Sequence, residues 1–144
     1  MKYFRPVATV LLLASACAAL QAQERPLVNA TVPFAFTAEN VTLPAGTYTV
    51  WTLSTYNMIK IQSADGRYVA MIPAIPSLKS EESKQAKLVF HRVGNEYFLA
   101  QVWEHGSKVH RDLRTGNRAR ELARNGDRMQ FITILANIGN DSLS

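Results

Sequence analysis

Between residues 27 and 103, apolar residues repeatedly alternate with polar ones, and many of the apolar ones are β-branched or aromatic. Because successive side chains of a strand point to opposite faces of a sheet, this period of two predicts strands rather than helices. A final stretch of the same kind follows near the carboxyl end. We expect about seven strands, at residues 27–36, 47–53, 58–62, 67–72, 87–93, 96–103 and 129–135.

Short turn sequences separate these strands and indicate how they pair. Asp65–Gly66 predicts one tight hairpin, and Gly94–Asn95 predicts a second with a type II′ turn, which takes glycine first. The second turn would place Arg92 opposite Tyr97, with the two strands in uninterrupted register beyond that pair. Since hairpins join consecutive strands, most of the pairs should be antiparallel.

One helix is expected, shortly before the last strand. Asn117 is a plausible N-cap, Ala119 and Leu122 follow with helical spacing, and Gly126 stands where a helix would end. These signals predict a helix over residues 118–125.

The complete pattern predicts an all-β fold of hairpin-linked strands with this single helix. A small barrel and a sandwich are both compatible with it, because either arrangement protects the edges of the sheet. Pro73 and Pro76 are expected to end the fourth strand, because proline has no backbone donor. Residues 77–85 should then form a polar loop.

The first 22 residues have the layout of a secretory signal peptide. Lys2 and Arg5 precede an apolar run over residues 7–20, and small residues follow up to Ala22. As a helix this run would be about 21 Å long, too short for a bilayer core of about 30 Å. We therefore expect cleavage after residue 22, a single β-rich domain over residues 23–144, and a secreted or periplasmic protein. The alternative is a lipoprotein anchored through Cys17.

Charge and motif content argue against several classes of function. The formal charge is +5, and it falls to +3 without the leader, which is too mild to predict nucleic-acid binding. Without Cys17 the chain has no thiol, and the spacing of His91, His105 and His110 fits no common metal motif. No nucleophile elbow or phosphate-binding glycine loop is present. The sequence thus predicts a protein that is not an enzyme and needs no cofactor or metal.

Two groups of side chains remain as candidate binding surfaces. Arg92, Tyr97 and Trp103 on the 87–103 hairpin could form a sugar-stacking or cation–π platform, although aromatic residues more often stabilise a sheet. A second group, Arg118, Arg120 and Arg124 on the predicted helix, could contact an anionic surface, although a solvated helix face is the commoner arrangement.

Four segments taken together resemble a known group of proteins. They are 32–36 (VPFAF), 43–50 (LPAGTYTV), 87–99 (KLVFHRVGNEYFL) and 120–123 (RELA), in this order. The chain resembles small uncharacterised secreted β-proteins of soil bacteria of the acidobacterial kind. The resemblance implies export and a single β-domain, and it implies no activity, cofactor or partner.

The sequence favours a non-catalytic exported β-domain that binds a small apolar ligand or a glycan in the periplasm or cell envelope. The alternative is a structural or assembly component that docks on a partner protein through a sheet edge or the basic helix. A ligand-binding barrel needs an apolar cavity, whereas a docking component needs an exposed apolar patch or an unprotected edge.

Overall fold

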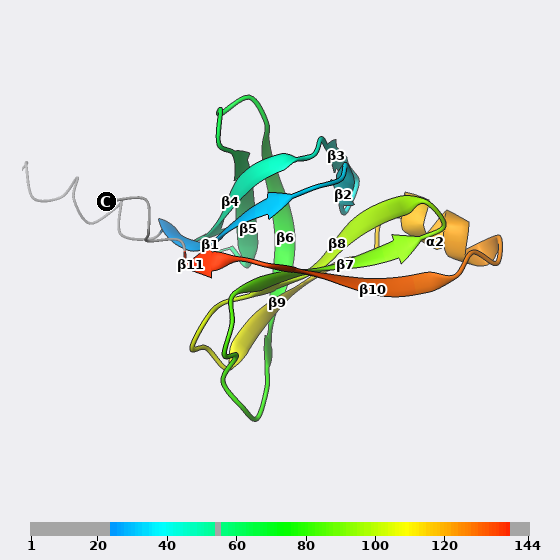
Figure 1. The fold of residues 1–144 in the computed structure, drawn as a ribbon. Coiled ribbons are helices and arrows are strands. Elements are labelled where there is room, and N and C mark those ends of the chain that lie inside the picture. The colour runs from blue at the N-terminus through cyan, green and yellow to red at the C-terminus, as the bar shows by residue number, and fades with distance from the viewer. Residues whose placement is uncertain (1–23, 54–55, 139–144) are drawn as a thin grey trace, which may run out of the picture.

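The computed structural model describes residues 24–53 and 56–138, so the predicted leader, its cleavage site at Ala22 and Cys17 lie outside the described residues. The strands are β1 (Glu24–Val32), β2 (Phe36–Ala38), β3 (Val41–Leu43), β4 (Gly46–Leu53), β5 (Met58–Ser63), β6 (Val69–Leu78), β7 (Lys87–Val93), β8 (Glu96–Trp103), β9 (Val109–Leu113), β10 (Met129–Leu135) and β11 (Asn137–Ile138). The helix α2 (Asn117–Arg124) lies between β9 and β10 (Figure 1).

The fold is all-β, as predicted, with a single described helix ahead of the last strands. The strands form one 11-stranded sheet with the order β10-β7-β8-β9-β6-β5-β4-β1-β11, and β2 and β3 lie off this path. Apart from the contact of β2 with β8, the pairs are antiparallel. The sheet is not closed into a barrel, and the arrangement is compatible with a sandwich.

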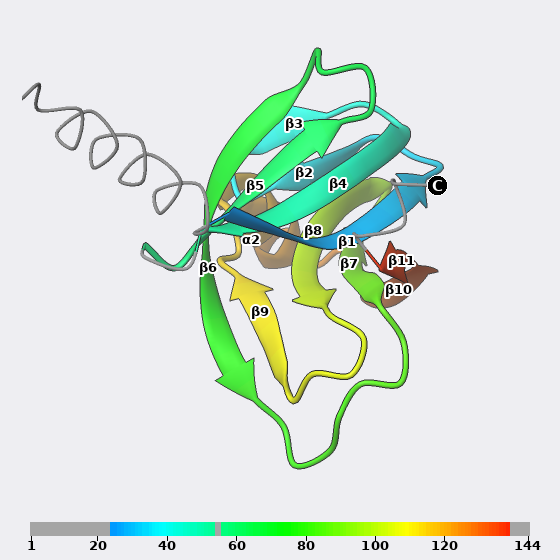
Figure 2. The same cartoon turned by 90° about the vertical axis from the view of Figure 1, so that its left-hand side faces the viewer.

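Strand β6 connects the two halves of the sheet. Its first part, up to Pro73, pairs with β5, and its second part, from Ala74, pairs with β9. Figure 2 shows β6 running the height of the molecule, beside β5 above and β9 below. The prediction that Pro73 and Pro76 end this strand is therefore wrong. Proline is tolerated here because neither ring nitrogen faces the paired strand. Ala74 donates to Asn57 and Lys79 donates to Lys108, so the alternation of an antiparallel ladder turns the nitrogen of Pro73 away from β5 and that of Pro76 away from β9.

Four strands were not predicted, and each is short or polar. The expected strand 27–36 is interrupted at Pro33, so that β1 ends at Val32 and β2 starts at Phe36. Strand β9 was missed because His110, Arg111 and Asp112 give its five residues little apolar periodicity. Its existence depends on β6 and β8, which flank it and supply its hydrogen-bonding partners.

The hairpin of β7 and β8 follows the predicted register only near its turn. Gly94 has a φ of 62°, as the first central residue of a type II′ turn requires, and Arg92 lies opposite Tyr97. A bulge then shifts the register, so that Val89 faces Gln101 and Ala100 has no opposite residue. The predicted uninterrupted register is wrong beyond Leu99. Because of the bulge, the side chains of β8 beyond Ala100 lie on the opposite faces of the sheet from those predicted.

The core lies between the two halves of the sheet. Its largest fully buried side chains come from both halves, and Phe36 makes edge-to-face contacts with Tyr48 and Phe90 at 5.3 and 5.4 Å between ring centroids. Tyr48 donates its hydroxyl hydrogen bond to the carbonyl of Pro44 at 2.5 Å. Burial of these aromatic and aliphatic side chains stabilises the packing of the two halves of the sheet against each other.

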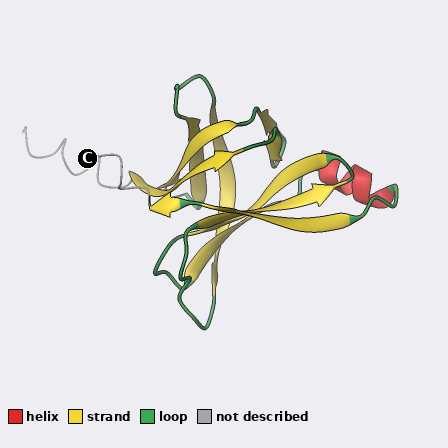
Figure 3. Ribbon diagram, in the orientation of Figure 1, coloured by secondary structure: helices red, strands yellow, loops and turns green. Residues whose placement is uncertain are grey.

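Helix α2 covers one end of the β7–β8 hairpin (Figure 3). Ala119 and Leu122 pack on Val93 and Phe98, forming a second, smaller apolar cluster. The helix begins one residue earlier than predicted, with Gly116 rather than Asn117 at the N-cap.

The cap of α2 comes from another part of the chain. Asn40, in the turn between β2 and β3, accepts a hydrogen bond from the backbone N–H of Asn117 at 3.2 Å. This satisfies one of the free donors in the first turn of the helix. Gly116 therefore lies directly against the β2–β3 turn, and an added Cβ there would be 1.8 Å from the carbonyl oxygen of Glu39.

Candidate functional site

Two of the three predicted platform residues lie together. The guanidinium carbon of Arg92 is 5.6 Å from the centre of the Tyr97 ring, within the range of a cation–π contact. The Tyr97 ring also stacks on Phe34, with 3.8 Å between ring centroids. Arg92 donates from Nε to the carbonyl of Gly94 at 3.1 Å. Phe34 and Tyr97 pack against the main core, so this group closes the core at the hairpin end.

Trp103 is not part of that group. It lies at the opposite end of β8, beyond the bulge, and faces the outer surface of the sheet. Its ring stacks on His110 with 4.3 Å between centroids and an interplanar angle of 7°. The ammonium groups of Lys79 and Lys87 lie 4.3 and 4.7 Å from the ring centre. Only 6% of Trp103 is exposed, so the indole has little free surface for stacking on a sugar.

A chain of hydrogen bonds fixes Trp103 in place. Its Nε1 donates to Oε1 of Gln101 at 3.0 Å, and Nε2 of Gln101 donates to Oδ1 of Asp112 at 2.9 Å. Ser77 donates to the other oxygen of Asp112 at 2.5 Å, and Nε2 of His110 lies 3.3 Å from Oδ1. Ser77 faces His110 across the β6–β9 ladder, but its hydroxyl hydrogen-bonds to the carboxylate of Asp112. This order of contacts is not that of a nucleophilic triad, in which the serine bonds to the histidine.

The three arginines of α2 differ in their surroundings. Arg118 forms an ion pair with Glu96 of β8 at 2.9 Å and a second with Glu121 at 3.4 Å. The hydrogen bond to Glu96 is the main cause of the raised pKa of Arg118. Arg120 donates to the neutral side chain of Asn117 at 2.8 Å, and Arg124 is exposed in the last turn. The predicted cationic surface therefore consists mainly of Arg120 and Arg124.

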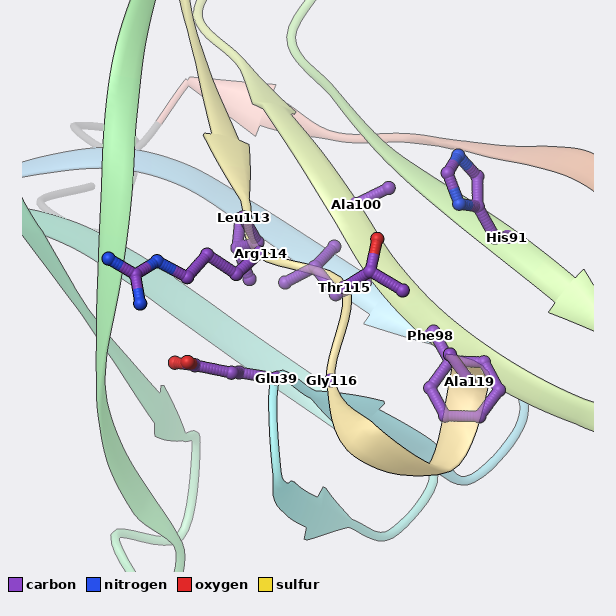
Figure 4. A pocket seen from close by; sticks show the side chains of 10 residues that line it. Glu39, His91, Phe98, Ala100, Leu113, Arg114, Thr115, Gly116 and Ala119 are labelled. Carbon is purple, nitrogen blue, oxygen red and sulfur yellow. The ribbon is translucent and has the colours of Figure 1, made fainter. Parts of the chain in front are cut away.

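A hollow lies between the start of α2 and the outer face of the sheet. Figure 4 shows His91, Phe98 and Ala100 on one side, with Arg114, Thr115 and Gly116 on the other. Its volume of about 30 Å³ accommodates one or two water molecules. Burial lowers the pKa of His91, whose ring meets Phe131 edge-to-face at 4.8 Å. The hollow is much smaller than a typical small-molecule site of about 300–1,000 Å³.

A wider hollow of about 480 Å³ lies between the β6–β7 and β8–β9 loops. The backbone of Ser83 bonds to both Ser107 and Gly106, which ties these two loops together. Charged side chains of both signs line this open basin. The lining residues are Glu81, Glu82, Ser83, Lys84, His105, Gly106 and Lys108. Within the described ranges, no group of three or more acidic, histidine or cysteine side chains is placed to hold a metal ion.

The surface that sequence reasoning missed is the free edge of β10. This strand pairs with β7 on one side and stands at the end of the strand order in the described part of the chain (Figure 1). Its sequence, MQFITIL, contains no charge, no proline and no glycine. Met129, Phe131 and Leu135 are 46%, 71% and 62% exposed. The lack of charge was visible in the sequence, but the position of the strand at an edge was not.

The direction of the backbone groups of β10 follows from its contacts with β7. Gly94 donates to the carbonyl of Arg128, and Ala136 donates to the carbonyl of Ala86. In an antiparallel ladder every second residue faces the partner strand, so the even-numbered residues of β10 bond to β7. The N–H and C=O groups of Met129, Phe131 and Thr133 therefore point away from β7. They form an edge that can accept another strand.

Searches of protein-family models, curated proteins and solved structures found no match to this chain. Among the described residues, no helix has the length and apolar character needed to cross a membrane.

Proposed function

We propose that this chain is a non-catalytic exported β-domain that docks on a partner protein by adding a strand to the free edge of β10. The observation that carries the proposal is this edge, which is seven residues long, uncharged and rich in exposed apolar side chains. Strand addition is a common mode of recognition, in which main-chain hydrogen bonds give affinity and alternate side chains give specificity.

The composition of β10 supports a binding role. Natural edge strands are usually kept from pairing by lysine, proline, a bulge or a short length. Strand β10 has none of these, although the chain places 16 lysine and arginine residues elsewhere. A strand of this kind is a hazard for aggregation unless it is covered. A partner strand would cover it and satisfy its free donors and acceptors.

Binding of a small apolar ligand has weaker support. The hollow beneath α2 is too small for such a ligand, and the wider basin between the loops is lined by charged side chains. Binding of a glycan at Trp103 would require Lys79 or Lys87 to move away from the indole. Docking at β10 needs no rearrangement of the described residues.

Site-specific photo-cross-linking tests the proposal. A photoreactive phenylalanine analogue replaces Phe131 in the full chain, which is then produced in a bacterial host that exports it. The control position is Tyr56, an aromatic residue that is 73% exposed and lies in the turn between β4 and β5 rather than on a strand edge. We expect a protein adduct from position 131 and none from position 56. Equal adducts from both positions, or none from position 131, would contradict strand addition.

A further inference from the structure

We infer that the strand added to β10 is the β10 strand of a second copy of this chain, antiparallel to the first about a two-fold axis. This inference rests on the function proposed above and names its partner. The pairing would join the sheets of the two copies edge to edge, with β7 flanking β10 in each copy. An interface of this kind uses the same surface patch on both copies.

The absence of charge on β10 favours pairing of the strand with its own copy. Two identical strands are poor partners when they carry charges, because antiparallel pairing can place like charges opposite each other. No residue from Met129 to Leu135 is charged, so β10 can pair with itself without this penalty. The same neutrality gives an acidic or basic partner strand nothing to recognise. A neutral apolar edge is therefore well matched to its own copy.

The free backbone groups of β10 also permit a symmetric register between two copies. The free N–H and C=O groups belong to odd-numbered residues, so an odd-numbered residue must lie opposite an odd-numbered residue of the second copy. Centring the pair on Phe131 places Met129 opposite Thr133 and Phe131 opposite itself. Cross-strand aromatic pairs stabilise a sheet. In this register Arg128 lies opposite Ile134 of the second copy, so the two Arg128 side chains are not placed opposite each other.

The free edge of β10 is long enough for this register. Beyond Ala136 the chain continues as β11, which pairs with Val28 and Asn29 of β1. The free edge therefore closes at its carboxyl end. Pairing centred on Phe131 uses only residues 129–133, which all precede this point. The register fits the segment of β10 that the fold leaves open.

Replacing Thr133 with proline tests the inference. The N–H of Thr133 points away from β7, so the substitution breaks no hydrogen bond within the chain, and the proline ring fills the space of a partner strand. Thr133→Ala is the matched control, because it removes the exposed side chain and keeps the N–H. The measurement is the mass of the leaderless chain by light scattering and native mass spectrometry, from low micromolar to submillimolar concentration.

We expect the wild type and Thr133→Ala to form dimers of equal affinity. Each dimer loses two equivalent hydrogen bonds in Thr133→Pro, so its dissociation constant should rise by about 30-fold or more. Wild-type protein that stays monomeric, or Thr133→Pro protein that dimerises like the wild type, would overturn the inference. If Thr133→Pro does not fold, Phe131→Lys replaces it and places two cations opposite each other. Its control is Tyr56→Lys, in the turn between β4 and β5, which should dimerise normally. A normal dimer of Phe131→Lys would also overturn the inference.

The cross-linking experiment separates this inference from the proposed function. An adduct of twice the chain mass from position 131 supports the second copy as partner. A monomeric wild type whose position 131 captures a different protein overturns the second copy and leaves strand addition in place. A monomeric wild type with no adduct at position 131 overturns both.

Discussion

Replacing Gly116 with alanine should destabilise the protein through lack of space. Gly116 has φ −73° and ψ 174°, a conformation that alanine adopts readily, so no backbone strain is involved. Its added Cβ, however, would lie 1.8 Å from the carbonyl oxygen of Glu39 and 2.7 Å from the carbonyl carbon. Both are backbone atoms, so the side chain cannot avoid them by choosing another rotamer. The start of α2 and the β2–β3 turn must move apart.

The cost can be worked out from the contacts that this movement disrupts. Losing the bond from Asn117 to Asn40 resembles the loss of an N-cap, which costs about 0.5–2 kcal/mol. Overpacking a buried site costs about 1–3 kcal/mol more. The free energy of unfolding should therefore fall by about 1.5–5 kcal/mol, a large part of the usual total of about 5–15 kcal/mol. The packing of Ala119 on Val93 and Phe98 would loosen as well.

Equilibrium unfolding in urea of the leaderless chain measures this loss. Gly46→Ala is the control, because its Cβ would meet only Tyr48, at an ordinary distance of 3.7 Å. We expect the control to change stability by less than about 1 kcal/mol. A loss below about 1 kcal/mol for Gly116→Ala would refute the reasoning, since it would mean that α2 and the β2–β3 turn can separate at almost no cost.

Two further predictions concern His91 and Trp103. Burial lowers the pKa of His91, so the unfolded chain binds a proton more readily, and stability should fall as the pH drops from about 6.5 to the lower folded pKa. Urea titrations at several pH values should show a smaller fall for His91→Gln, and equal slopes would contradict this account. Trp103→Ala removes a ring that is 6% exposed and stacked on His110, and it should cost about 3–5 kcal/mol in unfolding free energy. As a control, Tyr56→Ala, at a 73% exposed aromatic residue, should change the free energy of unfolding by less than about 0.5 kcal/mol. A similarly small effect of Trp103→Ala would contradict a structural role of the indole and make it a candidate binding residue again.

The hairpin of β7 and β8 shows how far the sequence could predict the candidate site. Local turn chemistry at Gly94 correctly placed Arg92 opposite Tyr97. It could not place Trp103, because the bulge at Ala100 moves the end of β8 to the other face of the sheet. A bulge of this kind depends on the neighbouring strands, and no residue in the hairpin sequence indicates its position. The predicted platform of three residues is therefore split in two.

By itself, the sequence determined the class of fold and the position of the helix. Period-two patterning, glycine turns and helix-end signals act over a few residues, so they can be read locally. Only the tertiary structure decided that β6 serves both halves of the sheet, that β9 forms between β6 and β8, and that β10 lies at an edge. These features depend on pairing between distant segments. A strand buried between two neighbours and a strand with a free side can have the same local pattern, and the sheet as a whole decides between them.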